Sequence, residues 1–121
     1  MATPDFYDQL DEMAQASGRY DPRAFIFVLR VLDHCRRRLG RQGHVTGREL
    51  LESARILALE EFGPTAKLVL NGWGIERTED LGHIVFLMVD RGLLSKTEED
   101  SIDAFRDGFD FETEFVRNYR W

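Results

Sequence analysis

The stretch covering residues 22–39 constrains the fold most, because it is apolar on nearly every side of a helix. Asp21-Pro22 is a helix-start signal, and Leu39-Gly40 is a stop signal because glycine readily adopts the left-handed conformation of a helix C-cap. A helix of this kind must be covered by other elements, so we expect it at the buried centre of the fold. Its apolar residues are Phe25, Ile26, Phe27, Val28, Leu29, Val31, Leu32 and Leu39.

The strongest local signal follows directly after this helix. Thr46 and Glu49 have the spacing of a capping box, in which each side chain accepts a hydrogen bond from the backbone amide of the other residue. Val45 can pack on Leu50 as a hydrophobic staple. These residues predict the start of a second long helix, which ends where Gly63 precedes a proline.

Three shorter helices complete the helical part of the prediction. Thr3-Pro4 is typical of an N-cap followed by the first helical residue, which predicts an amphipathic helix over residues 3–17. A short helix is expected over residues 65–70. Thr78 is then expected to cap a further helix over residues 78–91, whose first turn is acidic.

The pattern beyond residue 92 is ambiguous. Residues 93–96 and 102–105 are compatible with two short strands around an acidic tip, whereas residues 97–100 could instead begin a sixth helix. The hairpin is the favoured interpretation. In either case we expect residues 1–121 to form one domain, because no repeat, low-complexity segment or flexible linker interrupts the chain.

The expected fold class is therefore mainly α: a single compact domain of about five helices with a short β-hairpin, winged-helix-like in plan. It comprises an N-terminal helix over residues 3–17, a helical core over residues 22–96 and an acidic, aromatic C-terminal segment over residues 97–121. Sixteen residues separate the two helices that would form a helix-turn-helix, from Gly63 to Thr78, whereas that motif allows a turn of three or four. This spacing argues against DNA reading by such a motif.

The charge of the chain is concentrated in its second half. The net charge is −6; residues 1–60 carry nine arginines and nine acids, and residues 61–121 carry seven basic and thirteen acidic residues. An acidic surface of this kind repels phosphate backbones, so nucleic acid is the less favoured partner. No apolar run is longer than that of residues 84–89, which is far too short to span a membrane, and the N-terminus lacks the features of a secretory signal. We therefore expect no membrane contact and a cytoplasmic location.

Residue patterns that carry catalysis or metal binding are missing from the sequence. The three histidines and the single cysteine, Cys35, do not have metal-ligand spacing. Neither glycine-rich stretch matches a phosphate-binding loop, and no serine lies in a nucleophile-elbow motif. We therefore expect no catalytic residues, no metal, no cofactor and no enzymatic activity. Cys35 is expected to be a small buried apolar residue.

Two features could carry a function. The first is an arginine cluster, defined here as Arg36, Arg37, Arg38 and Arg41, which could hold phosphate or an acidic partner. The alternative interpretation is a solvated helix end that is stabilised by the helix dipole and by the chain's own acids.

The second feature is the aromatic C-terminal segment. Phe115, Tyr119 and Trp121 could be exposed anchors for a partner protein, since tyrosine and tryptophan dominate binding hot spots. The alternative is that Phe109, Phe111 and Phe115 close over the core.

Four segments of the chain carry a family resemblance. Residues 20–28, 44–51, 58–63 and 92–97 have the sequences YDPRAFIFV, HVTGRELL, ALEEFG and GLLSKT. Together they closely resemble a small conserved-hypothetical bacterial family described as restricted to planctomycete and verrucomicrobial lineages, and the resemblance spans roughly residues 6–115. It implies a bacterial, cytoplasmic protein and supplies no activity, cofactor or catalytic residue. Residues 116–121 lie outside it.

The function favoured by these features is a non-enzymatic protein-interaction or adaptor module of winged-helix-like type with an unidentified protein partner. The alternative is a nucleic-acid-binding regulator that uses the arginine cluster. The sequence leaves the oligomeric state open.

Overall fold

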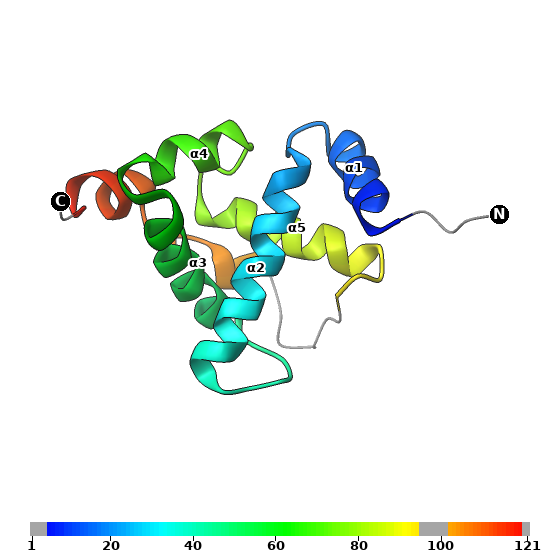
Figure 1. Ribbon diagram of the computed structural model, residues 1–121, viewed down its shortest axis with the longest axis horizontal. Helices are drawn as coiled ribbons and strands as arrows, with labels where there is room; N and C mark the ends of the chain where they lie inside the picture. Colours follow the sequence, from blue (N-terminus) through cyan, green and yellow to red (C-terminus); the bar gives the residue numbers. More distant parts are fainter. Residues whose placement is uncertain (1–4, 95–101, 120–121) are drawn as a thin grey trace.

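The computed structural model describes residues 5–94 and 102–119, and most of these residues are helical (Figure 1). The α-helices are α1 (Phe6–Ser17), α2 (Pro22–Leu39), α3 (Gly47–Phe62), α4 (Ala66–Gly72) and α5 (Thr78–Asp90). Two 3-10 turns, η1 (Gly63–Thr65) and η2 (Ile102–Phe105), and a π-helical turn, η3 (Glu112–Arg117), complete the described elements. The prediction of a mainly α fold is confirmed.

Helix α2 lies at the centre of the fold, as its all-round apolar surface predicts. It packs against α1, α3 and α5 (Figure 1). The Asp21 carboxylate accepts a hydrogen bond from the Arg23 amide at the N-terminal end, and Gly40 closes the C-terminal end with φ of 66°. The buried residues of α2 are Ala24, Phe25, Phe27, Val28, Val31, Leu32 and Cys35.

The predicted capping box at the start of α3 is confirmed. The Glu49 amide donates to the Thr46 hydroxyl at 3.1 Å, and the Thr46 amide donates to the Glu49 carboxylate at 2.8 Å. Val45 and Leu50 are both buried on the inner side of this start. The local sequence therefore determines where α3 begins.

The start of α1 differs from the prediction. Its N-cap is Asp5, whose carboxylate accepts a hydrogen bond from the Tyr7 amide at 2.6 Å. The cap that the sequence predicted, Thr3, lies outside the described residues. An aspartate is as good an N-cap as a threonine, so the local signal alone did not distinguish the two positions.

The predicted role of Thr78 as the cap of α5 is wrong. Thr78 is the first residue of the helix, and the preceding amides are bound instead by Asp80, which accepts hydrogen bonds from Glu76 at 2.8 Å and Arg77 at 3.2 Å. The Thr78 hydroxyl is fully buried and donates to the Phe105 carbonyl at 2.6 Å. The Thr78 hydroxyl therefore bonds to a residue 27 positions further along the chain instead of capping its own helix.

The predicted β-hairpin is wrong for residues 102–105. They form the 3-10 turn η2, and no strand occurs in the parts of the chain that the structure describes. The physical reason is that the Phe105 carbonyl bonds to Thr78 on α5 and is therefore taken from any strand partner. The expected winged-helix-like plan required this hairpin as its wing, and residues 102–105 do not form a strand of it. The alternative of a sixth helix begun by residues 97–100 falls outside the described residues.

Phe105 fastens η2 to the helical core. Its ring is buried against the helix surface at Gly82, where a Cβ atom would lie 2.7 Å from the ring. A Cβ at Gly47 would lie 2.7 Å from the Cβ of Ala104. Below these contacts, the Gly108 amide donates to the Thr78 hydroxyl at 3.0 Å. The segment after α5 is thus held against both α3 and α5 because glycines leave room for it.

We expect Gly82→Ala to lower the free energy of unfolding by about 1–3 kcal/mol, because the added methyl group overlaps the Phe105 ring. Urea unfolding measures the loss. The matched control is Gly72→Ala in α4, where an added Cβ meets nothing within 4 Å, so stability should stay equal or rise. An equal loss in both variants would contradict the packing of Phe105 on α5.

Candidate functional site

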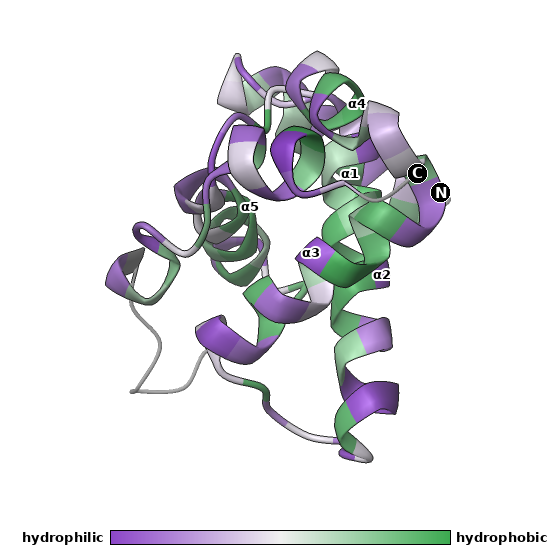
Figure 2. Ribbon diagram, turned by 90° about the vertical axis from the view of Figure 1, so that its left-hand side faces the viewer, coloured by the Kyte–Doolittle hydropathy of each residue, from purple (hydrophilic) through white to green (hydrophobic). Residues whose placement is uncertain are grey.

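A groove of about 400 Å³ opens between α2 from Val28 onward, the start of α3 and the second half of α5. We call it the α2–α3–α5 groove. Its wall is mainly apolar, and the Phe86 and Phe105 rings meet edge to face with centroids 6.5 Å apart. In Figure 2, α5 is hydrophobic over most of its visible length, which fits this apolar wall. The side chains that form the wall include Val28, Leu32, Leu50, Val85, Phe86 and Phe105.

The mouth of the groove carries the polar groups. Arg36 from α2 and His44 from the α2–α3 loop line it, together with Thr46 and the half-buried Leu93 and Leu94. No acidic residue lines the groove among the described residues. The site therefore combines an apolar interior with a cationic edge.

Arg36 is held at this edge by the loop that follows α2. Its Nε donates to the Gly43 carbonyl at 3.0 Å, and the residue is half-buried. Within the described residues Arg36 makes no ion pair. No carboxylate of the described residues therefore neutralises its positive charge.

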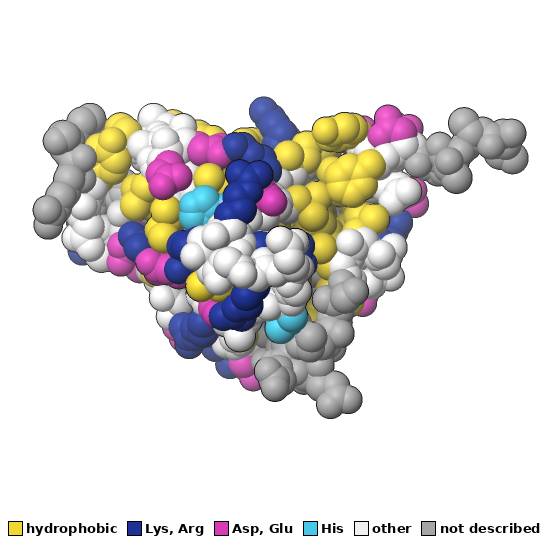
Figure 3. All heavy atoms as spheres, turned by 60° about the horizontal axis from the view of Figure 1, so that its bottom comes forward, with side chains coloured by type: hydrophobic (Ala, Val, Ile, Leu, Met, Phe, Trp, Pro, Cys, Tyr) yellow, Lys and Arg dark blue, Asp and Glu magenta, His cyan; other side chains and the backbone are white. Residues whose placement is uncertain are grey.

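The other members of the arginine cluster are engaged by the chain itself. Arg37 pairs with Asp33 at 2.7 Å, and Arg41 pairs with Glu49. Arg38 donates through Nε to the Ser53 hydroxyl at 3.0 Å. Figure 3 shows Lys and Arg side chains gathered on this end of the molecule with acidic side chains among them. The predicted cluster is therefore divided, with only Arg36 lining the groove.

The hydrogen bonds at the start of α3 also affect the pKa of Glu49. The hydrogen bond from the Thr46 amide, followed by the one from Arg41, holds the pKa of the Glu49 carboxyl below its ordinary value. A carboxylate kept ionised in this way binds Arg41 at neutral pH. Arg41 accordingly stabilises the fold of the α2–α3 connection.

The prediction that Phe115 is an exposed partner anchor is wrong. Its side chain is fully buried and packs with the rings of Phe109 and Phe111, at centroid distances of 5.6 and 5.1 Å. The alternative interpretation, that these aromatic residues close over the core, describes them correctly. Acidic residues alternate with these aromatic residues along the segment, so the sequence alone did not show whether the rings are buried or exposed.

The remaining predicted anchors have a different position. Tyr119 is half-buried, and its hydroxyl lies near Gly63 in η1, where a Cβ would be 3.2 Å away. Trp121 lies outside the described residues. The exposed apolar side chains at this end are Leu68 and Val116, which are 74% and 46% exposed and which the sequence did not single out. A role for Tyr119 or Trp121 in partner binding stays a prediction.

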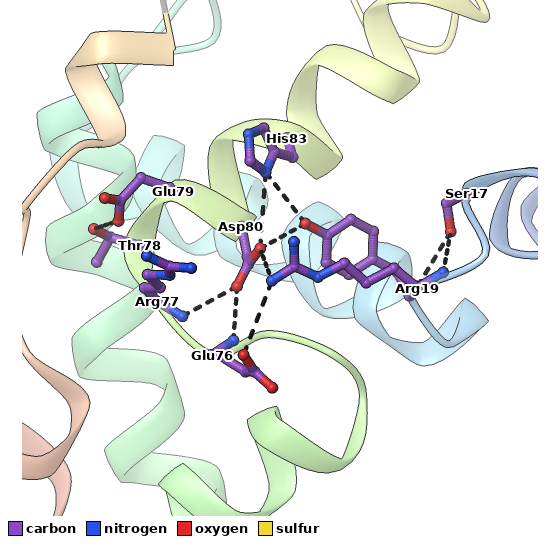
Figure 4. A network of polar contacts seen from close by, with 9 residues as sticks. Ser17, Arg19, Glu76, Arg77, Thr78, Glu79, Asp80 and His83 are labelled. Atoms are coloured by element: carbon purple, nitrogen blue, oxygen red, sulfur yellow. Dashed lines mark hydrogen bonds and ion pairs between the residues drawn. The ribbon is translucent and has the colours of Figure 1, made fainter.

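A polar network joins the α1–α2 loop to the start of α5 (Figure 4). Its centre is the buried Asp80 carboxylate, which accepts a hydrogen bond from the Tyr20 hydroxyl at 2.7 Å and pairs with Arg19 at 2.9 Å. The same carboxylate binds the amides of Glu76 and Arg77, so both of its oxygens are occupied. Asp80 is therefore a structural residue that connects three parts of the chain.

His83 lies at the edge of this network. Its Nδ1 is 3.3 Å from the Tyr20 hydroxyl and 3.7 Å from the Asp80 carboxylate, and its side chain is about half exposed. Among the described residues no group of three or more His, Cys, Asp or Glu side chains could hold a metal ion. Asp80, which the sequence assigned only to the first turn of α5, thus also binds Tyr20 and Arg19 of the N-terminal part.

Residues of the groove were missed by sequence reasoning for a physical reason. Val85, Phe86 and Phe105 each have an ordinary apolar environment in their own segment, and the groove exists only where three elements meet. The one usable signal was Phe86, an aromatic residue on a helix face that the apolar stripe of α5 does not need. Arg36 was found as part of the cluster, although its special position was not.

Replacing Tyr20 with phenylalanine should change the pH dependence of stability. Burial, and then the hydrogen bond to Asp80, raises the pKa of the Tyr20 hydroxyl well above its ordinary value of about 10. Because the unfolded chain loses this proton first, the stabilisation is complete below pH of about 10 and declines as the pH rises further. We expect the alkaline loss of unfolding free energy to be steeper in the wild type than in Tyr20→Phe.

Urea unfolding at a series of alkaline pH values measures this difference. The control is Tyr7→Phe on α1, where the side chain is 62% exposed and should leave the wild-type profile unchanged. Identical alkaline slopes in the wild type and Tyr20→Phe would show that the buried hydroxyl is not the group responsible.

Comparison with known proteins gives no indication of function, so the functional proposal below is based on the groove. No protein-family model, curated protein or solved structure matches the chain. The resemblance to a bacterial family therefore stays a prediction. Within the described residues, no helix combines the length and apolar character needed to cross a bilayer.

Proposed function

We propose that this chain is a non-enzymatic protein-interaction module whose α2–α3–α5 groove receives apolar side chains from a segment of a partner protein. The observation that carries the proposal is the groove itself, an open apolar recess of about 400 Å³ on an otherwise well-packed helical fold. Specific binding sites are concave and mainly apolar, with a few polar groups that fix orientation. The groove has this composition.

Several apolar side chains along the groove remain partly exposed, so a helical or extended segment of a partner could cover them. Val85, Phe86, Leu93 and Leu94 are only half-buried, so apolar surface on two sides remains in contact with water. A partner that covers it gains about 25 cal/mol for each Å² of apolar surface removed from water. Helix-in-groove recognition uses surfaces of this kind.

A binding role is consistent with the hydrogen bonds of the buried polar side chains, which are all made within the fold. Ser53 accepts a hydrogen bond from Arg38, Thr78 binds the segment after α5, and Asp80 binds the start of its own helix. Each of these buried polar residues stabilises the fold. The groove itself is lined mainly by apolar side chains, and its polar side chains are those of Arg36, His44 and Thr46. This composition favours binding over catalysis.

The alternative function, a nucleic-acid-binding regulator, has less support. Three of the four clustered arginines are already bound by Asp33, Glu49 and Ser53. Phosphate contacts would have to displace these partners. The alternative requires binding that weakens steeply with salt and is lost when Arg36, Arg37 and Arg38 are replaced by alanine.

A groove-filling variant tests the proposal. We expect Val85→Phe to abolish retention of a stoichiometric protein partner that the wild-type chain captures from native lysate, because the larger side chain fills the wall of the groove. The matched control is Val116→Phe, the same substitution at an exposed position in η3. Circular dichroism and thermal unfolding establish that both variants are folded.

The result depends on comparing partner retention by the variants with retention by the wild type, because a partner could be captured by any surface of the protein. Leu94→Glu provides a second change at the mouth of the groove and should also weaken retention. A partner retained equally by Val85→Phe, Leu94→Glu and the wild type would place the interaction elsewhere. Recovery of no stoichiometric partner by the wild type would also contradict the proposal.

A further inference from the structure

We propose that the α2–α3–α5 groove selects a guest with a carboxylate next to its apolar part, and that Arg36 binds this carboxylate. The inference rests on the proposed function, because both require the groove to accept an apolar group. It adds the chemical class of the partner segment: apolar side chains followed by an acidic residue. The two ideas can fail separately in the experiment below.

The first argument is the charge of Arg36. Arg36 is half-buried as a residue and lines a mainly apolar wall, so a guest seated in the groove displaces water from beside its guanidinium. Less water then screens a pair between this guanidinium and a carboxylate of the guest. Arg37, one residue along, is 80% exposed and already has Asp33 as its partner. Of these two neighbours, Arg36 is the one whose charge is left for a guest.

The second argument is the position of the Arg36 side chain. The hydrogen bond from Nε to the Gly43 carbonyl holds the guanidinium at the mouth, so a guest does not have to order a free side chain. The two Nη groups make no hydrogen bond within the described residues and have the fork geometry that suits a carboxylate. Arg36 is thus prepared for an anion.

The third argument is the charge of the surroundings. Arg48 follows the lining residue Gly47 directly, is exposed, and forms no ion pair with a described residue. No described lining residue is acidic. A guest with an acidic group therefore gains charge complementarity, whereas a basic guest meets like charges.

Octanoate and octanamide are suitable probes, because they have the same apolar chain and nearly the same shape but differ in charge. We expect calorimetric titration of the full chain to give about tenfold tighter binding of octanoate, which is the effect of one charge-assisted contact. In Arg36→Gln the two probes should bind alike. In Arg37→Gln, the matched control, the preference for octanoate should be unchanged.

A conservative variant and salt keep the test informative if Arg36→Gln is poorly folded. Arg36→Lys retains the charge without the fork, so it should keep only part of the preference. Raising the salt concentration should reduce octanoate binding to the wild type while leaving octanamide binding nearly constant.

Each outcome decides between the two ideas. Equal binding of octanoate and octanamide to the wild type overturns the charge selection and leaves the apolar groove of the proposed function intact. An octanoate preference that persists in Arg36→Gln assigns the anion to another residue and overturns the role of Arg36. Binding of neither probe contradicts both the inference and the proposed function.

Discussion

The packing of the Phe105 ring against the glycine surface of α5 is the contact on which the rest of the structure depends. The helices α2, α3 and α5 alone leave an open apolar face, and η2 closes part of it because Gly82 and Gly47 permit a close approach. Thr78 secures this arrangement through the Phe105 carbonyl and the Gly108 amide. The same ring forms one wall of the groove. The fastening of the C-terminal segment and the shape of the candidate site therefore have one physical origin.

The distribution of charge acquires a structural meaning from this arrangement. Among the described residues, the arginine cluster at the end of α2 is bound by groups of the neutral first half of the chain: the Asp33 and Glu49 carboxylates and the Glu49 carbonyl. An acidic residue of the second half, Glu112 in η3, pairs with Lys67 in α4 at 2.8 Å. Arg36 forms no ion pair with a described residue of either half, and it lies beside the apolar wall.

Local signals in the sequence predicted the elements whose hydrogen bonds are local. The ends of α2 and the capping box of α3 follow from residues within four positions of each other, so short patterns determine them. Thr78 and residues 102–105 were predicted wrongly because their decisive partners lie 27 residues apart along the chain. A hydroxyl near a helix start is normally a cap, and only the folded chain brings the Phe105 carbonyl to it.

The candidate site was predictable in part. The arginines were visible as a cluster, but the sequence could not show that Arg37, Arg38 and Arg41 each have an internal partner while Arg36 lies at a groove. The apolar wall could not be predicted, because in the sequence its residues are indistinguishable from ordinary core residues. Burial of Phe115 likewise depends on how the aromatic segment turns after η2.

The proposed binding surface of this protein is the one built around Phe105, and a chemical-shift map of the ¹⁵N-labelled chain during titration with octanoate shows where the probe binds. We expect the amides of Leu32, Val45, Phe86 and Phe105 to shift together and to reach saturation at the same concentration. Shifts confined to α4 and η3, or none at saturating octanoate, would contradict it.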